Sequence, residues 1–449
     1  MKQRYHMFKR MAGFAAALAL IVVLGTSVNA EGIEYGFNVE TRANAIYLMS
    51  LDTGEVIYEK NADTQVHPAS CTKIMTAALA MEMCGDLKNT MVTVPEGVWA
   101  EFEGLNVSTA GLKVGEELSM YDLICCMMLQ SGNEAASTVR DFYGGGAFIE
   151  QMNQKAAALG CVNTHFNNPH GVFADNHYSS AHDLAIITKW ALDIPGFWEI
   201  AQMSRYDKAE TNKNEPVTLT TTVLMQDKRS DYYQSYIKGI KTGTTDEAGR
   251  CLVSAAKQDG QSYLLVVLGG SMEGDSRVWK DGNSAFTDTK LIYDWAFENL
   301  ALQNLMNEDA VIADVPLKYA RQKDVLLLYP DSAVFAVVPK TLGTEYELTY
   351  ETELPDAVKA PVETDQKIGN AKVMFGGRVI GEVGLISRES VPLSRFVMTM
   401  DIASDILSSR TAKIVYLVLF GILVLYLWYV LVVVQNQRKN KKRRKKSGR

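Results

Sequence analysis

Residues 414–434 form a run of 21 residues without a single charged side chain. At 1.5 Å per residue, a helix of this length spans about 30 Å, the thickness of a bilayer's hydrocarbon core. Nine Lys or Arg residues follow, most of them between Arg438 and Lys446. The positive-inside rule therefore predicts a cytoplasmic tail at residues 435–449. The chain is predicted to be a single-pass protein of the cell membrane with its body outside the cytoplasm.

The first 30 residues have the pattern of a secretory signal peptide. Residues 2–10 are basic and residues 11–24 are apolar. Val28-Asn29-Ala30 is a small-x-small site that predicts cleavage before Glu31. The alternative is a retained N-terminal anchor. Export of the body agrees with the orientation predicted from the C-terminal tail.

The charge of the chain is unevenly distributed. Of the net charge of −7, the first 30 residues contribute +4 and residues 414–449 contribute +9, which leaves −20 on residues 31–413. An acidic body argues against a nucleic-acid partner, which requires a positive surface. The basic tail resembles a nucleic-acid patch in composition, but its position beside the apolar run favours contact with anionic lipid.

The cysteine and histidine pattern predicts neither a metal site nor a cofactor. C-x-x-C spacing does not occur in the sequence, and the six histidines are scattered without a spacing that suggests a metal site. The six cysteines are too few for a disulfide scaffold in 449 residues, and most are predicted to be buried free thiols. Whether any pair is bridged is left open by the sequence.

The first part of the body, residues 31–303, is predicted to be a sheet with helices packed on it. A hairpin opens it, helical patterns follow, and strand patterns return before a closing helix. These segments are, in order, residues 45–49 and 56–58; residues 74–84, 121–128 and parts of 146–205; residues 235–241, 251–256 and 263–269; and residues 287–300.

Residues 304–392 have a different pattern and are predicted to be a small β-sandwich-like domain. Short β-like runs are separated by turn residues, at 311–315, 325–328, 333–338, 346–350, 371–375 and 379–386. Residues 393–413 then show helical spacing of apolar side chains. They are predicted to form either a stalk or an amphipathic helix at the membrane interface.

Ser70-Cys71-Thr72-Lys73 is a Ser-x-x-Lys sequence at the start of a predicted helix. Residues three positions apart lie on one helix face, so the Ser70 hydroxyl and the Lys73 amine can meet. A lysine whose pKa is lowered by burial or by a second cation can remove the serine proton and activate the hydroxyl. By itself, the sequence also fits an N-cap serine beside a solvated lysine.

Two further motifs carry polar side chains at turns and strand ends. Ser131-Gly132-Asn133 follows a predicted helix and offers a second hydroxyl and a carboxamide on a tight turn. Lys241-Thr242-Gly243-Thr244 is predicted to end a strand at residues 236–240. There Gly243 lets a substrate backbone approach closely, and Lys241 supplies a second cation that would satisfy a peptide carboxylate. Each motif alone also fits an ordinary loop or strand end.

Together, the three motifs match the Ser-x-x-Lys, Ser-x-Asn, Lys-Thr-Gly pattern of the penicillin-recognising serine enzymes. The stretches that carry the match are residues 67–76, 130–136, 168–171, 179–185 and 240–245. On these residues, the chain resembles the D-alanyl-D-alanine carboxypeptidases, the low-molecular-mass penicillin-binding proteins, over about residues 35–300. The resemblance implies their α/β (α+β) fold, an antiparallel sheet with packed helices.

The resemblance also implies catalytic roles. Ser70 would be the acylated nucleophile and Lys73 its general base. Ser131 would complete the proton relay, and Asn133 would orient the substrate. The backbone N–H groups of Ser70 and Thr244 would form the oxyanion hole.

Substrate-binding roles follow from the same resemblance. Lys241, Thr242 and Gly243 would bind the terminal D-Ala carboxylate and lie along the peptide, with Thr244 beside them. Arg277 lies where relatives place an arginine that steers the carboxylate. A surface arginine is the alternative for that position.

The implied activity is removal of the terminal D-Ala from peptidoglycan pentapeptides, which would limit cross-linking of the cell wall. β-Lactams would acylate Ser70 because they mimic that peptide. The alternatives are a D,D-endopeptidase that cuts cross-links and a β-lactam sensor that is acylated without turnover. An inert wall-binding protein would be expected to have lost one of the three motifs.

Two other patterns in the sequence resemble catalytic groups. His170, or His182 with Asp183, could belong to a Ser-His-Asp triad, but Ser70 already has a lysine as its base. Glu215-Pro216 resembles the deacylating glutamate of class A β-lactamases, but it lies too close to Lys241 in the chain. Neither pattern is assigned a catalytic role, and efficient β-lactam hydrolysis is not expected.

Overall fold

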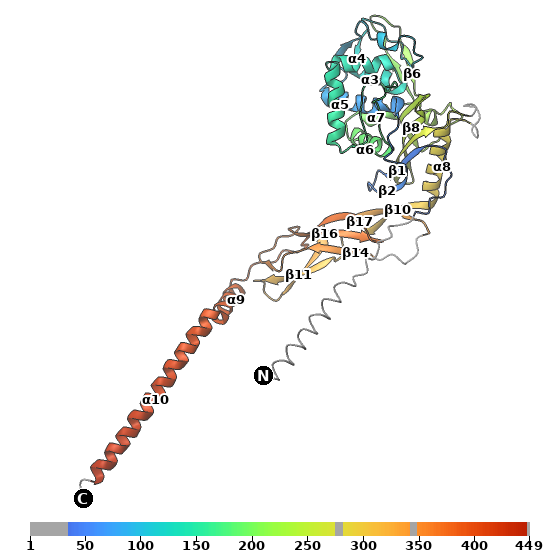
Figure 1. Cartoon of the computed structure of the whole chain (residues 1–449). Helices are drawn as coiled ribbons and strands as arrows, with labels where there is room; N and C mark the ends of the chain where they lie inside the picture. The colour runs from blue at the N-terminus through green and yellow to red at the C-terminus, as the bar shows by residue number, and fades with distance from the viewer. Residues whose placement is uncertain (1–34, 274–281, 342–347, 447–449) are drawn as a thin grey trace, which may run out of the picture. The chain divides into compact units, whose positions relative to one another are not determined.

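The computed structural model describes residues 35–273, 282–341 and 348–446 (Figure 1). The chain forms two compact units, which are described separately. The first contains the described residues up to Asn304 together with segments from Phe335–Glu347 and Gly376–Ile380. The predicted signal peptide at residues 1–30 and the predicted site residue Arg277 lie outside the described residues.

A five-stranded antiparallel sheet forms the centre of the first unit. Its strands follow the order β2-β1-β9-β8-β7, so β7 lies at an edge. They are β1 (Ala45–Ser50), β2 (Val56–Lys60), β7 (Ile237–Thr245), β8 (Gly249–Gln258) and β9 (Gln261–Gly270). The predicted opening hairpin and the three later strands are confirmed. Strands from the beginning and the end of the unit are therefore direct neighbours.

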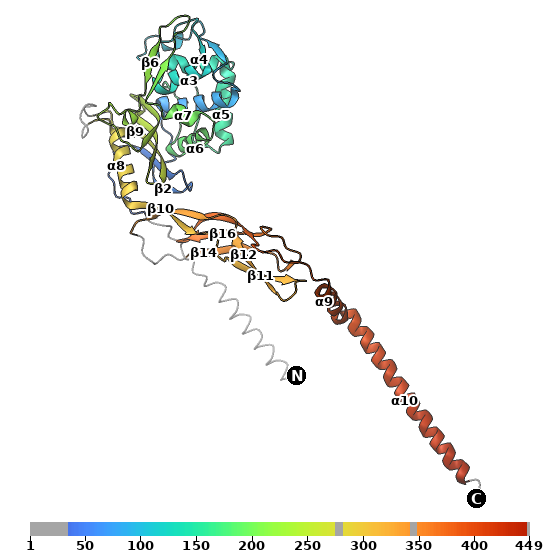
Figure 2. The ribbon, with the colours of Figure 1, turned by 180° about the vertical axis from the view of Figure 1, so that it is seen from behind.

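Both faces of this sheet are covered by helices. Along β9, Leu264 and Val266 join one buried cluster and Leu265 and Val267 join another, because successive side chains point to opposite faces. The first cluster packs against α2 (Lys73–Met83), α3 (Met120–Leu129), α4 (Asn133–Phe142), α5 (Gly146–Ala158), α6 (Ala181–Leu192) and α7 (Phe197–Ala201). The second packs against α8 (Ser284–Asn299), on the opposite side of the sheet (Figure 2).

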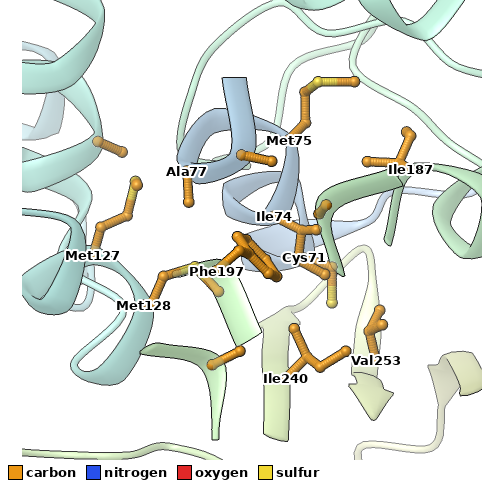
Figure 3. Packing of buried hydrophobic residues seen from close by; sticks show 14 of the residues in the cluster. Cys71, Ile74, Met75, Ala77, Met127, Met128, Ile187, Phe197, Ile240 and Val253 are labelled. Atoms are coloured by element: carbon orange, nitrogen blue, oxygen red, sulfur yellow. The ribbon is translucent and has the colours of Figure 1, made fainter. Parts of the chain in front are cut away.

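Buried apolar side chains fill the space between α2 and the sheet (Figure 3). Ile74 and Phe197 pack there against Ile240 of β7 and Val253 of β8. Cys71 is fully buried in the same cluster, and burial raises the pKa of its thiol. The prediction of free thiols is confirmed, because all six cysteines are unbridged and five are buried.

Several short elements were not predicted from the sequence. They lack a repeated apolar pattern long enough to identify. Two small hairpins pair antiparallel, β3 (Met91–Thr93) with β4 (Glu117–Ser119) and β5 (Arg205–Lys208) with β6 (Val217–Thr220). Three 3₁₀ helices are η1 (Ala69–Thr72), η2 (Ala100–Phe102) and η3 (Leu224–Gln226).

One strand predicted within the small β domain does not join the sheet of the second unit. The run at residues 333–338 is strand β13 (Val334–Pro339), but it pairs with β10 (Leu300–Met306) and not with the sheet of the second unit. Val337 is buried in the cluster beneath α8, and its N–H donates to Glu55 Oε2 at 3.4 Å. An alternating pattern identifies a strand but not its neighbour, so the sequence could not assign this pairing.

The second unit is all-β before its C-terminal helices, as predicted. Its strands form one six-stranded sheet in the order β14-β16-β17-β12-β11-β15. They are β11 (Ala313–Lys318), β12 (Val325–Pro330), β14 (Leu348–Glu353), β15 (Val358–Lys359), β16 (Lys367–Phe375) and β17 (Arg378–Ile386). Leu326, Leu328 and Val373 are fully buried and belong to its core.

Two helices end the chain. Residues 393–413, for which the sequence left two alternatives, contain α9 (Arg395–Ser408), which buries none of its side chains. Ser394 caps this helix by accepting a hydrogen bond from the N–H of Val397 at 3.4 Å. The following helix, α10 (Arg410–Lys446), includes a segment, Arg410–Asn440, that is long and apolar enough to cross a membrane.

Candidate active site

Ser70 and Lys73 lie on one continuous turn of helix. Ser70 belongs to η1, which runs directly into α2 at Lys73. Lys73 Nζ donates to Ser70 Oγ at 3.0 Å. The helical spacing of Ser-x-x-Lys therefore brings the hydroxyl and the amine into hydrogen-bond contact.

Lys73 is fully buried and is held by neutral acceptors. Besides Ser70, its amine donates to Asn133 Oδ1 at 2.8 Å and to the carbonyl oxygen of His170 at 2.7 Å. Burial, followed by the nearby Lys241 cation, lowers the pKa of Lys73 well below its usual value. The side chain can therefore exist as a neutral amine that accepts the Ser70 proton.

Ser131-Gly132-Asn133 forms the sharp connection between α3 and α4. Ser131 has a φ of 59°, a left-handed conformation that costs a non-glycine residue about 1 kcal/mol or more. A Cβ on Gly132 would lie 3.1 Å from the Ala110 Cβ, so the loop containing Ala110 packs tightly on this turn. Both the backbone N–H and the side-chain amide of Asn133 donate to the Ser108 carbonyl oxygen at 3.0 Å.

The Lys-Thr-Gly motif lies inside edge strand β7 and not at its end. The strand was predicted from the sequence to end at Ile240, whereas its pairing with β8 continues through Thr245. The prediction was wrong because the polar side chains of the motif interrupt the apolar pattern. Backbone pairing with β8 does not require apolar side chains. Lys241 is fully buried, and its Nζ donates to the Thr242 carbonyl oxygen at 3.0 Å. Burial lowers the pKa of Lys241 to about 8.

Strand β7 lies directly against the residues around the Ser70 hydroxyl. A Cβ on Gly243 would lie 2.9 Å from the Pro68 carbonyl oxygen and 3.1 Å from the Ser70 nitrogen. No side chain fits there without displacing the strand. Gly243 thus brings the edge of the sheet and the start of α2 together.

A cavity of about 360 Å³ opens between these elements. Its lining includes Ser70, Ser131, Thr242, Gly243 and Thr244. Lys73 and Lys241 are buried in its surroundings and contribute the two amines of the motifs. All three sequence motifs therefore converge on one cavity, although successive motifs are about 60 and 110 residues apart in the chain.

The two histidines that could have formed a triad have other partners. His170 contributes its carbonyl oxygen to Lys73, while its buried ring lies with Nε2 3.6 Å from Glu101 Oε2. Burial lowers the pKa of His170 to about 4. His182 Nδ1 contacts Asp63 Oδ1 at 2.9 Å on the surface. Their observed contacts agree with leaving both rings out of the predicted chemistry.

Comparison with known proteins adds independent support. The family profile of the D-alanyl-D-alanine carboxypeptidases matches residues 31–272, more than half of the chain. The chain belongs to the D-alanyl-D-alanine carboxypeptidase family. A second profile, that of the C-terminal domain of penicillin-binding protein 5, matches residues 301–393. The resemblance identified from the motifs is confirmed.

Two named relatives align with most of this chain and with most of their own length. The D-alanyl-D-alanine carboxypeptidase DacA of Escherichia coli (strain K12) is 30% identical, over 84% of this chain and 93% of the relative. DacF of Bacillus subtilis (strain 168) is 29% identical, over 79% of this chain and 87% of the relative. The chain is therefore a serine-type peptidase.

Solved structures confirm the predicted fold class. Penicillin-binding protein 5 from Haemophilus influenzae has a TM-score of 0.62 and 26% identity, over 79% of this chain and 99% of that protein. The Streptomyces K15 DD-transpeptidase has a TM-score of 0.53 and 28% identity, over 58% of this chain and 99% of that protein. The penicillin-recognising fold is thus shared with a penicillin-binding protein and with a DD-transpeptidase.

A buried glutamate next to Ser131-Gly132-Asn133 was not predicted from the sequence to have a role at the site. Glu134 follows Asn133, and its Oε1 accepts from Thr109 Oγ1 at 2.8 Å, the Ala110 N–H at 2.7 Å and the Leu112 N–H at 3.3 Å. It therefore ties the loop that carries Ser108 to the start of α4. The acidic residue in the stretch Ser-Gly-Asn-Glu was the available signal, because an acid in a helix's first turn is favoured there.

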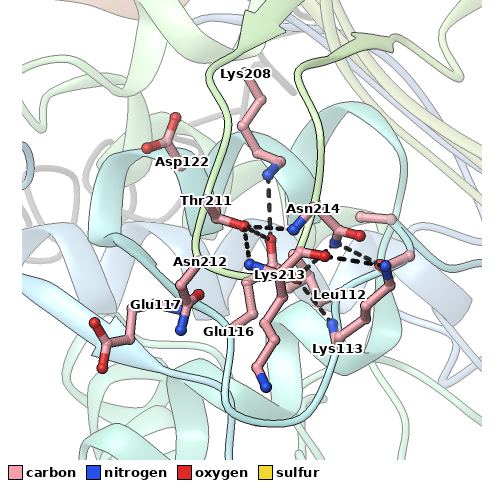
Figure 4. Close-up of polar contacts among 12 residues, drawn as sticks. Leu112, Lys113, Glu116, Glu117, Asp122, Lys208, Thr211, Asn212, Lys213 and Asn214 are labelled. Carbon is pink, nitrogen blue, oxygen red and sulfur yellow. Dashed lines mark hydrogen bonds and ion pairs between the residues drawn. The ribbon is translucent and has the colours of Figure 1, made fainter.

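A second polar cluster continues this support (Figure 4). Glu116 is fully buried and pairs with Lys208 of β5 at 3.2 Å. Its carboxylate also accepts from Thr211 Oγ1 at 3.0 Å, Asn214 Nδ2 at 2.7 Å and the Lys113 N–H at 2.9 Å. The cluster joins the loop before β4 to the β5–β6 hairpin. It gives a long irregular segment near Asn133 a defined position.

Proposed function

We propose that this chain is a membrane-anchored serine D,D-carboxypeptidase that removes the terminal D-Ala from peptidoglycan stem peptides through an acyl-enzyme on Ser70. The observation that carries the proposal is the 3.0 Å contact between Ser70 Oγ and Lys73 Nζ, in surroundings that favour a neutral lysine. Limiting the supply of pentapeptide would limit cross-linking of the wall.

In the proposed acylation step, Ser70 Oγ attacks the carbonyl carbon between the two D-Ala residues and passes its proton to Lys73 Nζ. The backbone N–H groups of Ser70 and Thr244 stabilise the oxyanion. The C–N bond then breaks, and the departing D-Ala amine takes a proton through Ser131 and Lys73. Water attacks the resulting ester, its proton returns to the same relay, and Ser70 is released.

The peptide is proposed to lie along the edge of the sheet. Strand β7 is unpaired on one side and carries Lys241, Thr242 and Gly243, so an extended peptide can add to it as a further strand. Asn133 orients the scissile amide. Arg277 remains a proposed binding residue on the basis of the family resemblance. β-Lactams occupy the same place and acylate Ser70.

The proposed location is the outer face of the cell membrane. Helix α10 supplies an apolar segment of sufficient length, and the basic tail favours the cytoplasm as its C-terminal side. Residues 1–30 are proposed as a signal peptide, 31–303 as the catalytic domain and 304–392 as a small β domain. Strand β13 is proposed to complete the catalytic domain from within the second segment, because it pairs with β10.

The decisive experiment compares residues 31–413 with its Ser70→Ala variant. We expect D-alanine release from a pentapeptide ending in D-Ala-D-Ala by the parent and none by the variant. Ser332→Ala, an exposed serine in the second unit, is the matched control and should keep full activity. A folded parent that releases no D-alanine would contradict the proposal. Cleavage of cross-linked dimers would then favour the endopeptidase alternative. A stable β-lactam adduct would favour the sensor.

A second acceptor for the acyl group follows from the likeness to the Streptomyces K15 DD-transpeptidase. The acyl-enzyme could be attacked by an amine in place of water. Adding a free D-amino acid to the assay and weighing the products distinguishes the two outcomes. Exchange of the terminal residue, in place of its loss, would identify transpeptidation.

A further inference from the structure

We propose that Arg250 recognises the terminal carboxylate of the substrate and so selects free peptide C-termini over internal peptide bonds. The inference rests on the proposed function and names a residue that none of the three motifs contains. It is carried by the position of Arg250 in the active-site cavity and by the state of its guanidinium group.

Arg250 reaches the cavity from the strand next to the Lys-Thr-Gly motif. It is the second residue of β8 and pairs directly with Thr244 of β7. Side chains of directly paired residues project from the same face of a sheet, with Cβ atoms about 5 Å apart. Arg250 and Thr244 accordingly line the same cavity as Ser70.

The guanidinium group of Arg250 is available to a ligand. Of the described residues that line the cavity, Arg250 is the one with a formal charge. Its Nε is buried and has no hydrogen-bond acceptor within the described part of the chain. A buried donor without an acceptor is costly, and a ligand carboxylate would remove that cost.

Two other donors on this face of β7 are already engaged. Thr242 Oγ1 donates to Thr222 Oγ1 at 2.6 Å, and Thr244 Oγ1 donates to the Gly243 carbonyl oxygen at 2.7 Å. Lys241 is fully buried, and strand alternation directs its side chain to the face opposite Thr242. On the cavity face of β7, the free planar donor is therefore the one supplied by Arg250.

A carboxylate is the group that such a donor fits best. Arginine binds carboxylates through two parallel N–H···O bonds, which no neutral amide can match. The terminal carboxylate is also what distinguishes a C-terminal D-Ala from the same residue inside a cross-link. Arg250 would therefore act in substrate selection, beside the cleavage chemistry of Ser70 and Lys73.

The test uses the membrane-inserted full chain and two substrates, a peptide ending in D-Ala-D-Ala and the same peptide with a C-terminal amide. For Arg250→Gln, we expect kcat/KM for the acid to fall about 10- to 100-fold, the range for a lost hydrogen bond between charged groups. The amide should change less than about 3-fold, because it never made that bond. Arg250→Lys should lie between the two. Lys257→Gln, an exposed cation on the same strand, is the matched control.

The amide substrate also tests the integrity of the site, because a distorted site would lose both reactions together. Equal losses for acid and amide, or no loss for either, would overturn the assignment. Binding of the acid peptide to the Ser70→Ala chain, with and without Arg250→Gln, is measured by calorimetry and needs no turnover. We expect about 10-fold weaker binding with Arg250→Gln, and equal affinities would again overturn it. A parent that binds the acid but does not cleave it would contradict the proposed function alone.

Discussion

Two lysines share the interior of the site, and their protonation states have opposite requirements. In the proposed mechanism, Lys73 must be neutral to accept a proton, whereas Lys241 must be charged to attract a carboxylate from the face of β7 opposite Thr242. Both are fully buried, and the charge of Lys241 helps to lower the pKa of Lys73. The charge of Lys241 therefore supports the role proposed for Lys73.

The pH dependence of kcat/KM should be bell-shaped for this reason. Its rising limb follows loss of the proton from Lys73, whose pKa is lowered well below the usual value. Its falling limb follows loss of the charge on Lys241 as the pH rises through about 8. The limbs report the coupled pair of lysines. D-alanine release between pH 5 and 10 measures the profile.

The variant Lys73→Arg tests the role of general base that is proposed for Lys73. Arginine stays protonated at every pH in this range, so β-lactam acylation of Ser70 should fall at least about 100-fold. A profile that stays flat above pH 8 would contradict the role given to Lys241. A Lys73→Arg chain that is acylated normally would contradict the role given to Lys73.

Edge strand β7 packs directly against η1, the element that carries Ser70. Gly243 makes this packing possible, because a Cβ would come within 2.9 Å of the Pro68 carbonyl oxygen. The sequence motif names the glycine, but the two segments that it brings together are about 170 residues apart.

We therefore expect Gly243→Ala to move β7 and to lower kcat/KM about 100-fold, the effect of a displacement of about 1 Å at a catalytic site. Activity and the unfolding midpoint are both measured. Gly146→Ala is the control, because Gly146 is the first residue of α5 and a Cβ there would meet nothing within 4 Å. Alanine is also readily accepted in a helix. It should keep full activity and the parent's stability. Full activity of Gly243→Ala would show that β7 adjusts without moving the substrate.

The proposed membrane attachment concerns the whole molecule, and two helices are proposed to contribute to it. Helix α10 is long and apolar enough to span the bilayer. Helix α9 precedes it directly and exposes large apolar side chains, among them Phe396 and Ile406, which are 74% and 62% exposed. An exposed apolar helix beside a membrane span favours the interfacial alternative over a plain stalk.

Three chains test this attachment: the full chain, residues 31–408 and residues 31–394. The full chain should remain with membranes at high salt. Residues 31–408 should bind lipid vesicles reversibly, at least about 10-fold better than residues 31–394, because burial of one large apolar side chain contributes about 2 kcal/mol. Sedimentation with vesicles measures both. Equal partitioning of the two shorter chains would favour the stalk, and Phe396→Ser in the longer one should lower its binding.

The sequence alone determined those features that depend on neighbours in the chain. The uncharged run at residues 414–434, the helix that follows Ser70 and the central strands all follow from local apolar patterns. The family was also predictable, and with it the proposed chemistry of Ser70, Lys73 and the Lys-Thr-Gly motif, because the three motifs together are specific to one kind of site. Their convergence on one cavity was implied by the family resemblance and not by spacing.

The tertiary structure decided everything that depends on distant segments meeting. Strand β13 pairs with β10, strand β7 continues through its polar motif, and Ser131 adopts a left-handed φ. Arg250 becomes a cavity residue only because its strand lies beside Thr244. The physical reason is the same in each case. Local patterns set which face of an element is apolar, whereas pairing partners, backbone strain and the surroundings of a charge arise only when the elements pack.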